Sequence, residues 1–173
     1  LQSSGSGWDW SIWGDGSIDV GGTYLSPAAY DAIRTGTTLY NLSGSGGAGA
    51  VIGHAGTKKF VDGTCVLNVQ VGQSITPNWD GQFSMNNSDG DSLSFEAMGN
   101  IQSGGLLSGN QVMYNMNVNG SAFGRGDITS ESIKGNLVGP GVSPTPITGA
   151  VGEFHFNHGT AASVDGAFGA DLN

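Results

Sequence analysis

The 173-residue chain is long enough to bury a hydrophobic core within one domain. Its net charge is −9 and it has only five Lys and Arg residues, which excludes a nucleic-acid-binding surface because phosphate contacts need clustered basic side chains. The 32 glycines show no collagen-like period and fall between short apolar runs, a pattern typical of many turns and not of disorder.

The first 37 residues are expected to form a lead-in that packs on the main domain. The Gly/Ser-rich start, residues 1–7, is typical of a linker or a processed edge, so we expect a longer precursor. The tryptophan-rich segment Trp8–Trp13 is expected to plug a barrel end or pack against the barrel wall. Ser26 as N-cap and Pro27 at the first helical position predict a short helix that continues to Ile33.

Residues 38–173 are predicted to form a β domain of about eight strands. Apolar and polar residues alternate in short runs between turn signals, as in strands with one buried face. The predicted strands are 38–43, 65–71, 79–86, 92–98, 112–119, 132–138, 150–156 and 164–172. Their inward faces carry the large side chains of Trp79, Phe83, Met85, Phe95, Tyr114, Met116, Phe154, Phe156 and Phe168.

Successive antiparallel strands with one apolar face either close as an up-and-down barrel or stack as a sandwich. We favour an all-β meander that closes as a roughly eight-stranded barrel, because closure leaves no edge strand; the sandwich remains the alternative. The large inward side chains would fill such a barrel, which disfavours a central ligand cavity. The runs are shorter than membrane-spanning strands and their aromatic residues lie mid-strand, so we expect no membrane span.

The last third of the chain resembles a known family. The segments Gly135–Pro140 and Ile147–Phe156, followed by Val164–Ala170 as a further copy of the closing strand, resemble the strand–turn–strand signature of the transferrin-binding protein B-like β-barrel. The resemblance covers residues 132–172 and implies an exported bacterial protein, either extracellular, on the cell surface or periplasmic. Family members include receptors for host transferrin, complement regulators and haem, so the resemblance implies a binding partner without naming it.

The histidines give weak candidates for a metal or haem site. His155 and His158 are three residues apart, and such positions on a strand point to opposite faces, so they cannot chelate one ion. We expect His155 to face outward and His158 to cap a turn. A haem ligand role for one of them, together with His54, is the alternative. We therefore expect no cofactor and no bound metal, and a colourless protein.

Three other motifs have simple structural interpretations. Asp89–Asp91 lies among hard oxygen ligands but lacks the spacing of a calcium loop, so we expect a hairpin turn. Arg125–Asp127 spells an adhesion tripeptide, and we expect an ordinary loop. Cys65 lies in an alternating run and is expected to be a small buried hydrophobic residue and not a reactive thiol.

Catalysis finds little support in the sequence. No Gly-x-Ser-x-Gly segment lies between a strand and a helix. The carboxylates Glu96, Glu153 and Asp165 fall on outward positions among polar neighbours, where a perturbed pKa is not expected. The sequence therefore predicts a protein that is not an enzyme.

Recognition is expected at three glycine-rich loops, namely 44–63, 99–110 and 139–149. Their candidate binding residues are Gly46, Gly47, His54, Gly104, Gly105, Pro140 and Pro144. We expect an exported, non-enzymatic module that binds another protein, or haem or an iron source, through these loops. The alternative is a structural or assembly domain of a cell-surface or extracellular complex. The oligomeric state stays open.

Overall fold

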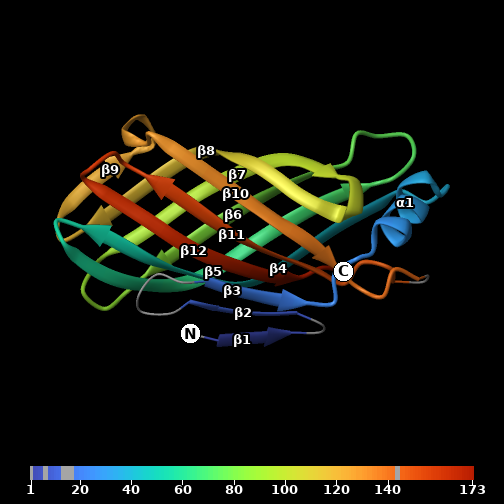
Figure 1. Cartoon of the computed structure of the whole chain (residues 1–173), viewed down its shortest axis with the longest axis horizontal. Helices are drawn as coiled ribbons and strands as arrows, with labels where there is room; N and C mark the ends of the chain where they lie inside the picture. Colours follow the sequence, from blue (N-terminus) through green and yellow to red (C-terminus); the bar gives the residue numbers. More distant parts are fainter. Residues whose placement is uncertain (1, 6–7, 13–17, 143–144) are drawn as a thin grey trace.

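The computed structural model describes residues 2–5, 8–12, 18–142 and 145–173, and most of them form a closed antiparallel barrel (Figure 1). The eight barrel strands are β4 (Tyr40–His54), β5 (Thr57–Val71), β6 (Asn78–Asn86), β7 (Ser92–Gln102), β8 (Leu106–Val118), β10 (Ser130–Val138), β11 (Gly149–Asn157) and β12 (Ala162–Asp171). Strands that follow one another pair, β8 pairs with β10, and β12 pairs with β4 to close the barrel. The predicted up-and-down barrel is therefore confirmed.

Smaller elements surround the barrel. The short strand β9 (Ser121–Gly124) pairs with the end of β8 and continues into the 3-10 turn η2 (Arg125–Asp127). A second 3-10 turn, η1 (Ser103–Gly105), joins β7 to β8. A separate antiparallel sheet contains β1 (Gln2–Gly5), β2 (Trp8–Ile12) and β3 (Ile18–Gly22).

Aromatic side chains fill the barrel. Phe83 stacks on Phe95 with ring centroids 4.3 Å apart, and Phe95 meets Phe154 edge-on at 4.8 Å. Phe156 and Tyr114 extend this cluster, with centroids 5.0 Å apart. All nine large residues predicted to face inward are buried. The lumen is therefore a packed core, as expected for eight strands.

The N-terminal sheet lies along the outside of the barrel (Figure 1), where β2 and β3 contact β11 and β12. Beneath it, Val51, Val151 and Ala167 lie on outward positions of their strands and are nevertheless buried. The lead-in is thus a second layer over one part of the wall. The expectation for the tryptophans concerns side chains that lie outside the described residues.

The helix α1 (Pro27–Thr35) closes one end of the barrel. The Ser26 side chain accepts the backbone N–H of Ala29, so the predicted helix start is confirmed. Tyr30 is fully buried, and its hydroxyl donates to the carbonyl of Ile101 at 3.3 Å. No helix in the described part of the chain is long and apolar enough to cross a membrane.

The glycine-rich segment 44–56 is mostly strand, which corrects the prediction of a loop. Strand β4 runs through it to His54, and β5 begins at Thr57 after a two-residue turn. Glycine has no side chain to alternate, so the strand has no visible period. The absence of side chains also lets β4 and β12 come close together: a Cβ added at Gly46 would lie 2.6 Å from the Cα of Ala170.

We expect the Cys65 thiol to resist modification in the native protein. It is buried in the core, and burial raises its pKa to about 12, while the thiolate is the reactive form. A colorimetric disulfide reagent at pH 8 should therefore react only as fast as the protein unfolds. Rapid stoichiometric reaction in native buffer, without a change in circular dichroism, would contradict this prediction.

Candidate functional site

Two of the connections between barrel strands lie at the α1 end. Segments 72–77, 139–142 and 145–148 lie there beside the helix (Figure 1). The backbone N–H of Gly141 donates to the carbonyl of Pro146 at 2.9 Å, and Gly141 packs against Ala29 of α1. The loop and the helix therefore form one packed face at this end.

Exposed apolar side chains lie at this same end of the barrel. Leu39 is 50% exposed in the link between α1 and β4, Leu106 is 45% exposed at the start of β8, and Val142 is 64% exposed in the 139–148 loop. The helix contributes one ion pair, Arg34 with Asp31 at 3.9 Å. A surface with few charges loses little solvation free energy when a partner covers it.

The predicted binding residues are not brought together. Gly46 and Gly47 lie within β4, and His54 ends that strand at the far end of the barrel. Gly104 and Gly105 belong to η1, which packs beside Pro27 and Tyr30 of α1. Their assignment to long loops is wrong, because the segments 44–63 and 99–110 consist mainly of paired strands.

The third predicted loop, 139–149, is confirmed over its described residues 139–142 and 145–148, which lie between β10 and β11 outside any helix or strand. Pro140 is exposed within it, and Pro144 lies outside the described residues. Sequence reasoning missed Leu39, Leu106 and Val142, because single exposed apolar residues follow no period. Each of the three lies beside a turn signal or a helix end, and this position is the sequence feature that could have identified them.

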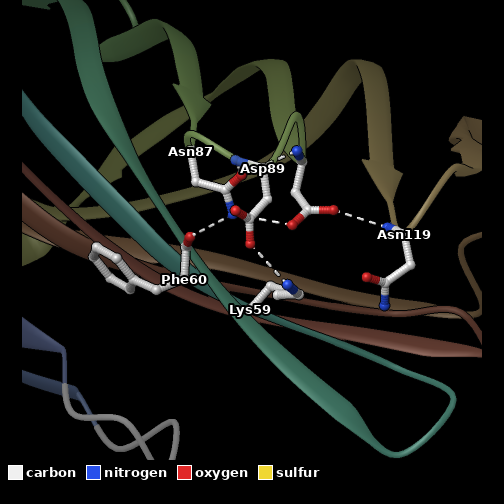
Figure 2. A network of polar contacts seen from close by, with 6 residues as sticks. Lys59, Phe60, Asn87, Asp89 and Asn119 are labelled. Atoms are coloured by element: carbon white, nitrogen blue, oxygen red, sulfur yellow. Dashed lines mark hydrogen bonds and ion pairs between the residues drawn. The ribbon is translucent and has the colours of Figure 1, made fainter.

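The stretch around Asp89 and Asp91 is a hairpin turn, as predicted, and Asn87 organises it (Figure 2). The Asn87 side-chain oxygen accepts the backbone N–H groups of Asp89 and Asp91, each at 3.0 Å. Its amide nitrogen donates to the carbonyl of Phe60 and to the Asp91 carboxylate, also at 3.0 Å. One side chain thereby ties the β6–β7 turn to β5.

The Asp91 carboxylate extends this network to a third segment. Its second oxygen accepts the backbone N–H of Asn119 in the β8–β9 turn at 2.8 Å (Figure 2). Lys59 and Asp89 form an ion pair at 2.9 Å beside it. Both oxygens of the buried Asp91 are engaged with protein donors, so the geometry supports a structural clamp at this end of the barrel.

We expect Asp91→Ala to lower the free energy of unfolding by about 2–3 kcal/mol at pH 7, because buried donors lose a charged acceptor. Hydrogen bonds from Asn87 and Asn119 lower the pKa of Asp91. A carboxyl group whose pKa is lower in the folded protein than in the unfolded chain stabilises the fold at pH values above the unfolded-state pKa. This stabilisation is lost as the pH falls. Denaturant titrations should therefore show the difference between wild type and variant narrowing below about pH 4. A difference independent of pH would contradict this origin.

The outer wall carries a row of three polar side chains. Ser132 lies opposite His155, which lies opposite Asp165 on the next strand. The His155 Nδ1 atom is 2.6 Å from the Asp165 carboxylate, and both side chains are more than one-third exposed. Acyl-transfer sites exclude water around the reacting atoms, whereas this row is open to solvent. His155 therefore faces outward, as predicted, in a surface hydrogen bond with Asp165.

The adhesion tripeptide is held in the η2 turn. The Arg125 guanidinium donates to the carbonyl of Val112 at 3.2 Å. The Asp127 carboxylate accepts the backbone N–H of Gly124 at 2.7 Å. Both charged side chains therefore have partners within the chain, and the segment serves as a cap on the end of β9. It is an ordinary exposed turn, as predicted.

Comparisons with known proteins give little beyond the fold. No family model matches the chain, and no curated protein matches it. Among solved structures, the YwiB protein from Bacillus subtilis is similar over 77% of this chain and 93% of its own length, with 7% sequence identity and a TM-score of 0.37. This likeness is too weak to carry an argument about function.

Proposed function

We propose that the chain is an exported, non-enzymatic bacterial β-barrel module that binds another protein through its α1 end. The observation that carries this proposal is the combination of a filled lumen with exposed Leu39, Leu106 and Val142 at that end. A filled lumen leaves recognition to the surface, and loops on a rigid scaffold are the usual place for it. Exposed apolar side chains provide the desolvated centre of an interface.

The resemblance of residues 132–172 to the transferrin-binding protein B-like barrel supports the export and binding parts of the proposal. The filled lumen supports a protein as the first partner to test, because the packed core leaves no central cavity of the kind that small ligands occupy. Haem or an iron source bound at the same end is the second ligand to test.

The experiment compares two matched variants of the chain. One carries Leu39→Ser, Leu106→Ser and Val142→Ser at the α1 end, and the control carries Val66→Ser and Met113→Ser on the outer wall, where both residues are exposed. Each immobilised protein is exposed to the envelope fraction of the source cell, captured proteins are identified, and the affinity of the purified partner is measured. We expect at least about tenfold weaker binding for the first variant alone.

Two outcomes decide against the proposal. Equal binding by both variants would remove the α1 end from the interface. Concentration-dependent self-association in sedimentation, lost only in the α1-end variant, would support the alternative of an assembly domain, because the same surface would then join copies of this chain.

A further inference from the structure

The ring of a buried histidine at the β9 end of the barrel lacks hydrogen-bond partners, although the backbone of this residue bonds with Ala161 and Ala162. His158 follows β11 and is only 5% exposed, and neither ring nitrogen has a hydrogen bond. Its ring lies against Tyr114 and Phe123, with centroids 5.3 Å away in each case. The residue was expected to cap a turn, but it continues the inward parity of Phe156. Unpartnered buried polar groups are rare and destabilising, so this one needs an explanation.

A second unpartnered group lies on β8, three residues before Tyr114. Gln111 is 5% exposed, and its side-chain oxygen has no hydrogen bond. The backbone N–H of Gln111 donates to the Glu131 carboxylate at 3.3 Å, and Glu131 lies directly opposite Phe156 in the β10–β11 pair. We call Gln111, Tyr114, Glu131 and His158 the β9-end polar cluster.

The barrel wall is weakest beside this cluster. Strands β8 and β10 pair through only four residues each, Leu106–Gly109 with Ile133–Asn136, whereas the other barrel pairs extend over nine or more. A bulge in β8 next to Gln111 interrupts the register with β7. Beyond this short pairing, β9 pairs with residues 115–118 of β8, and Arg125 of η2 bonds the carbonyl of Val112. We call residues 121–127, which contain β9 and η2, the flap (Figure 1).

Ring packing, one side-chain hydrogen bond and a short strand pairing hold the flap against the barrel. Phe123 packs on His158 and on His54, each with centroids 5.3 Å apart. Arg125 bonds the carbonyl of the bulge residue Val112. Strand β9 pairs with β8 through four residues. Short, partly exposed pairings of this kind open at low free energy in native proteins.

We propose that the β9-end polar cluster binds a small protonated amine with an apolar body, which enters when the flap moves aside. The unpartnered acceptors are the Gln111 oxygen and an imidazole nitrogen of His158, and the Glu131 carboxylate, which accepts the Gln111 backbone N–H, supplies the negative charge. The rings of Tyr114 and Phe123 supply faces that attract a cation. The ligand's ammonium group would donate the hydrogen bonds that these acceptors lack.

The electrostatics agree with a cationic ligand. Burial is the main cause that lowers the pKa of His158, so the ring is neutral at pH 7 and one nitrogen can accept a hydrogen bond. The Ala162 backbone and, to a smaller extent, the Asp127 carboxylate favour the protonated ring and oppose this lowering of the His158 pKa. The net charge of −9 further raises the local concentration of cations.

The binding test uses three probes of similar size, 2-phenylethylamine, 3-phenylpropan-1-ol and phenylacetate, in titrations followed by protein NMR. We expect saturable shifts of the Tyr114, Phe123 and His158 resonances with the amine alone. Glu131→Gln keeps the shape of the side chain and should weaken binding of the amine by about tenfold or more, because a charge-assisted hydrogen bond is lost. Ser132→Ala, on the outward face of the same strand, is the matched control and should bind normally. Equal binding of the alcohol or the acid, or no saturation, would overturn the proposal.

Thermal stability provides a second measurement, whose outcome differs between a ligand-binding histidine and a purely structural one. His158→Phe removes the unpartnered nitrogens, keeps the ring volume and should raise the thermal midpoint by about 3–8 °C while abolishing amine binding. A lowered midpoint with unchanged amine binding would assign His158 to the scaffold and overturn its role. A high-resolution structure of amine-soaked crystals with ordered waters alone on Gln111 and His158 would also overturn the proposal.

Discussion

Phe154→Ala should lower the free energy of unfolding by about 3–5 kcal/mol, the typical cost of removing a buried aromatic ring. Phe154 is 1% exposed and contacts Phe95, Phe83 and Phe156 at centroid distances of 4.8, 6.0 and 5.8 Å. These rings come from three different strands, so they cannot collapse into the space without moving the barrel wall. The expected loss is therefore close to the full cost of the cavity.

The next residue provides the control. His155 points outward, and its side chain is 45% exposed beside Asp165. Exposed ion pairs contribute about 0–1 kcal/mol, so His155→Ala should change stability by less than about 1 kcal/mol. Urea titrations at pH 7 would give both values from the transition midpoints and slopes. Equal losses for the two variants would contradict the assigned faces of β11.

Much of this fold could be predicted because half-buried strands leave a period of two in the sequence. In β6, Trp79, Phe83 and Met85 are buried and Gln82 is exposed, as the alternation indicates. Large side chains make such a face visible, since each must enter the core or remain in water. The alternation of these positions therefore predicts which side chains meet inside the barrel.

The extension of β4 beyond the predicted strand 38–43 could not be predicted for the opposite reason. Between Gly44 and Ala50 it contains only Gly, Ser and Ala, which are equally typical of turns. What makes this segment a strand is its pairing with β5 on one side and β12 on the other. Tertiary contacts therefore override a local preference, and single-sequence patterns do not contain that information.

The candidate sites were predicted less well than the fold. His158 was expected to cap a turn, although its spacing of two from Phe156 and four from Phe154 continues the inward face. Gln111 was missed because the bulge in β8 shifts the parity before Tyr114. An insertion of one residue is invisible in a sequence whose neighbouring positions, Asn110 and Val112, fit either face.

Gly46→Ala should prevent stable closure of the barrel and lower the free energy of unfolding by about 3 kcal/mol or more. Gly46 pairs with Cys65 of β5 and Ala170 of β12, at the pair of strands that closes the barrel. A Cβ at this position would overlap the Gly169 carbonyl group and lie 2.6 Å from the Cα of Ala170. Backbone atoms cannot avoid the clash by changing rotamer, so the two strands must separate.

Cys65 reports this separation directly, because its Sγ lies 3.5 Å from the Gly47 carbonyl and 3.6 Å from the Gly169 carbonyl. If β4 and β12 part, the thiol gains access to water and loses the burial that raises its pKa. Gly46→Ala should thus react with a thiol reagent many times faster than wild type and unfold at lower urea concentration. The matched control is Gly126→Ala in η2, where an added Cβ meets no atom within 4 Å, and both measurements should match wild type. If Gly46→Ala is as stable and as unreactive as Gly126→Ala, then β4 and β12 do not approach as closely as their pairing requires.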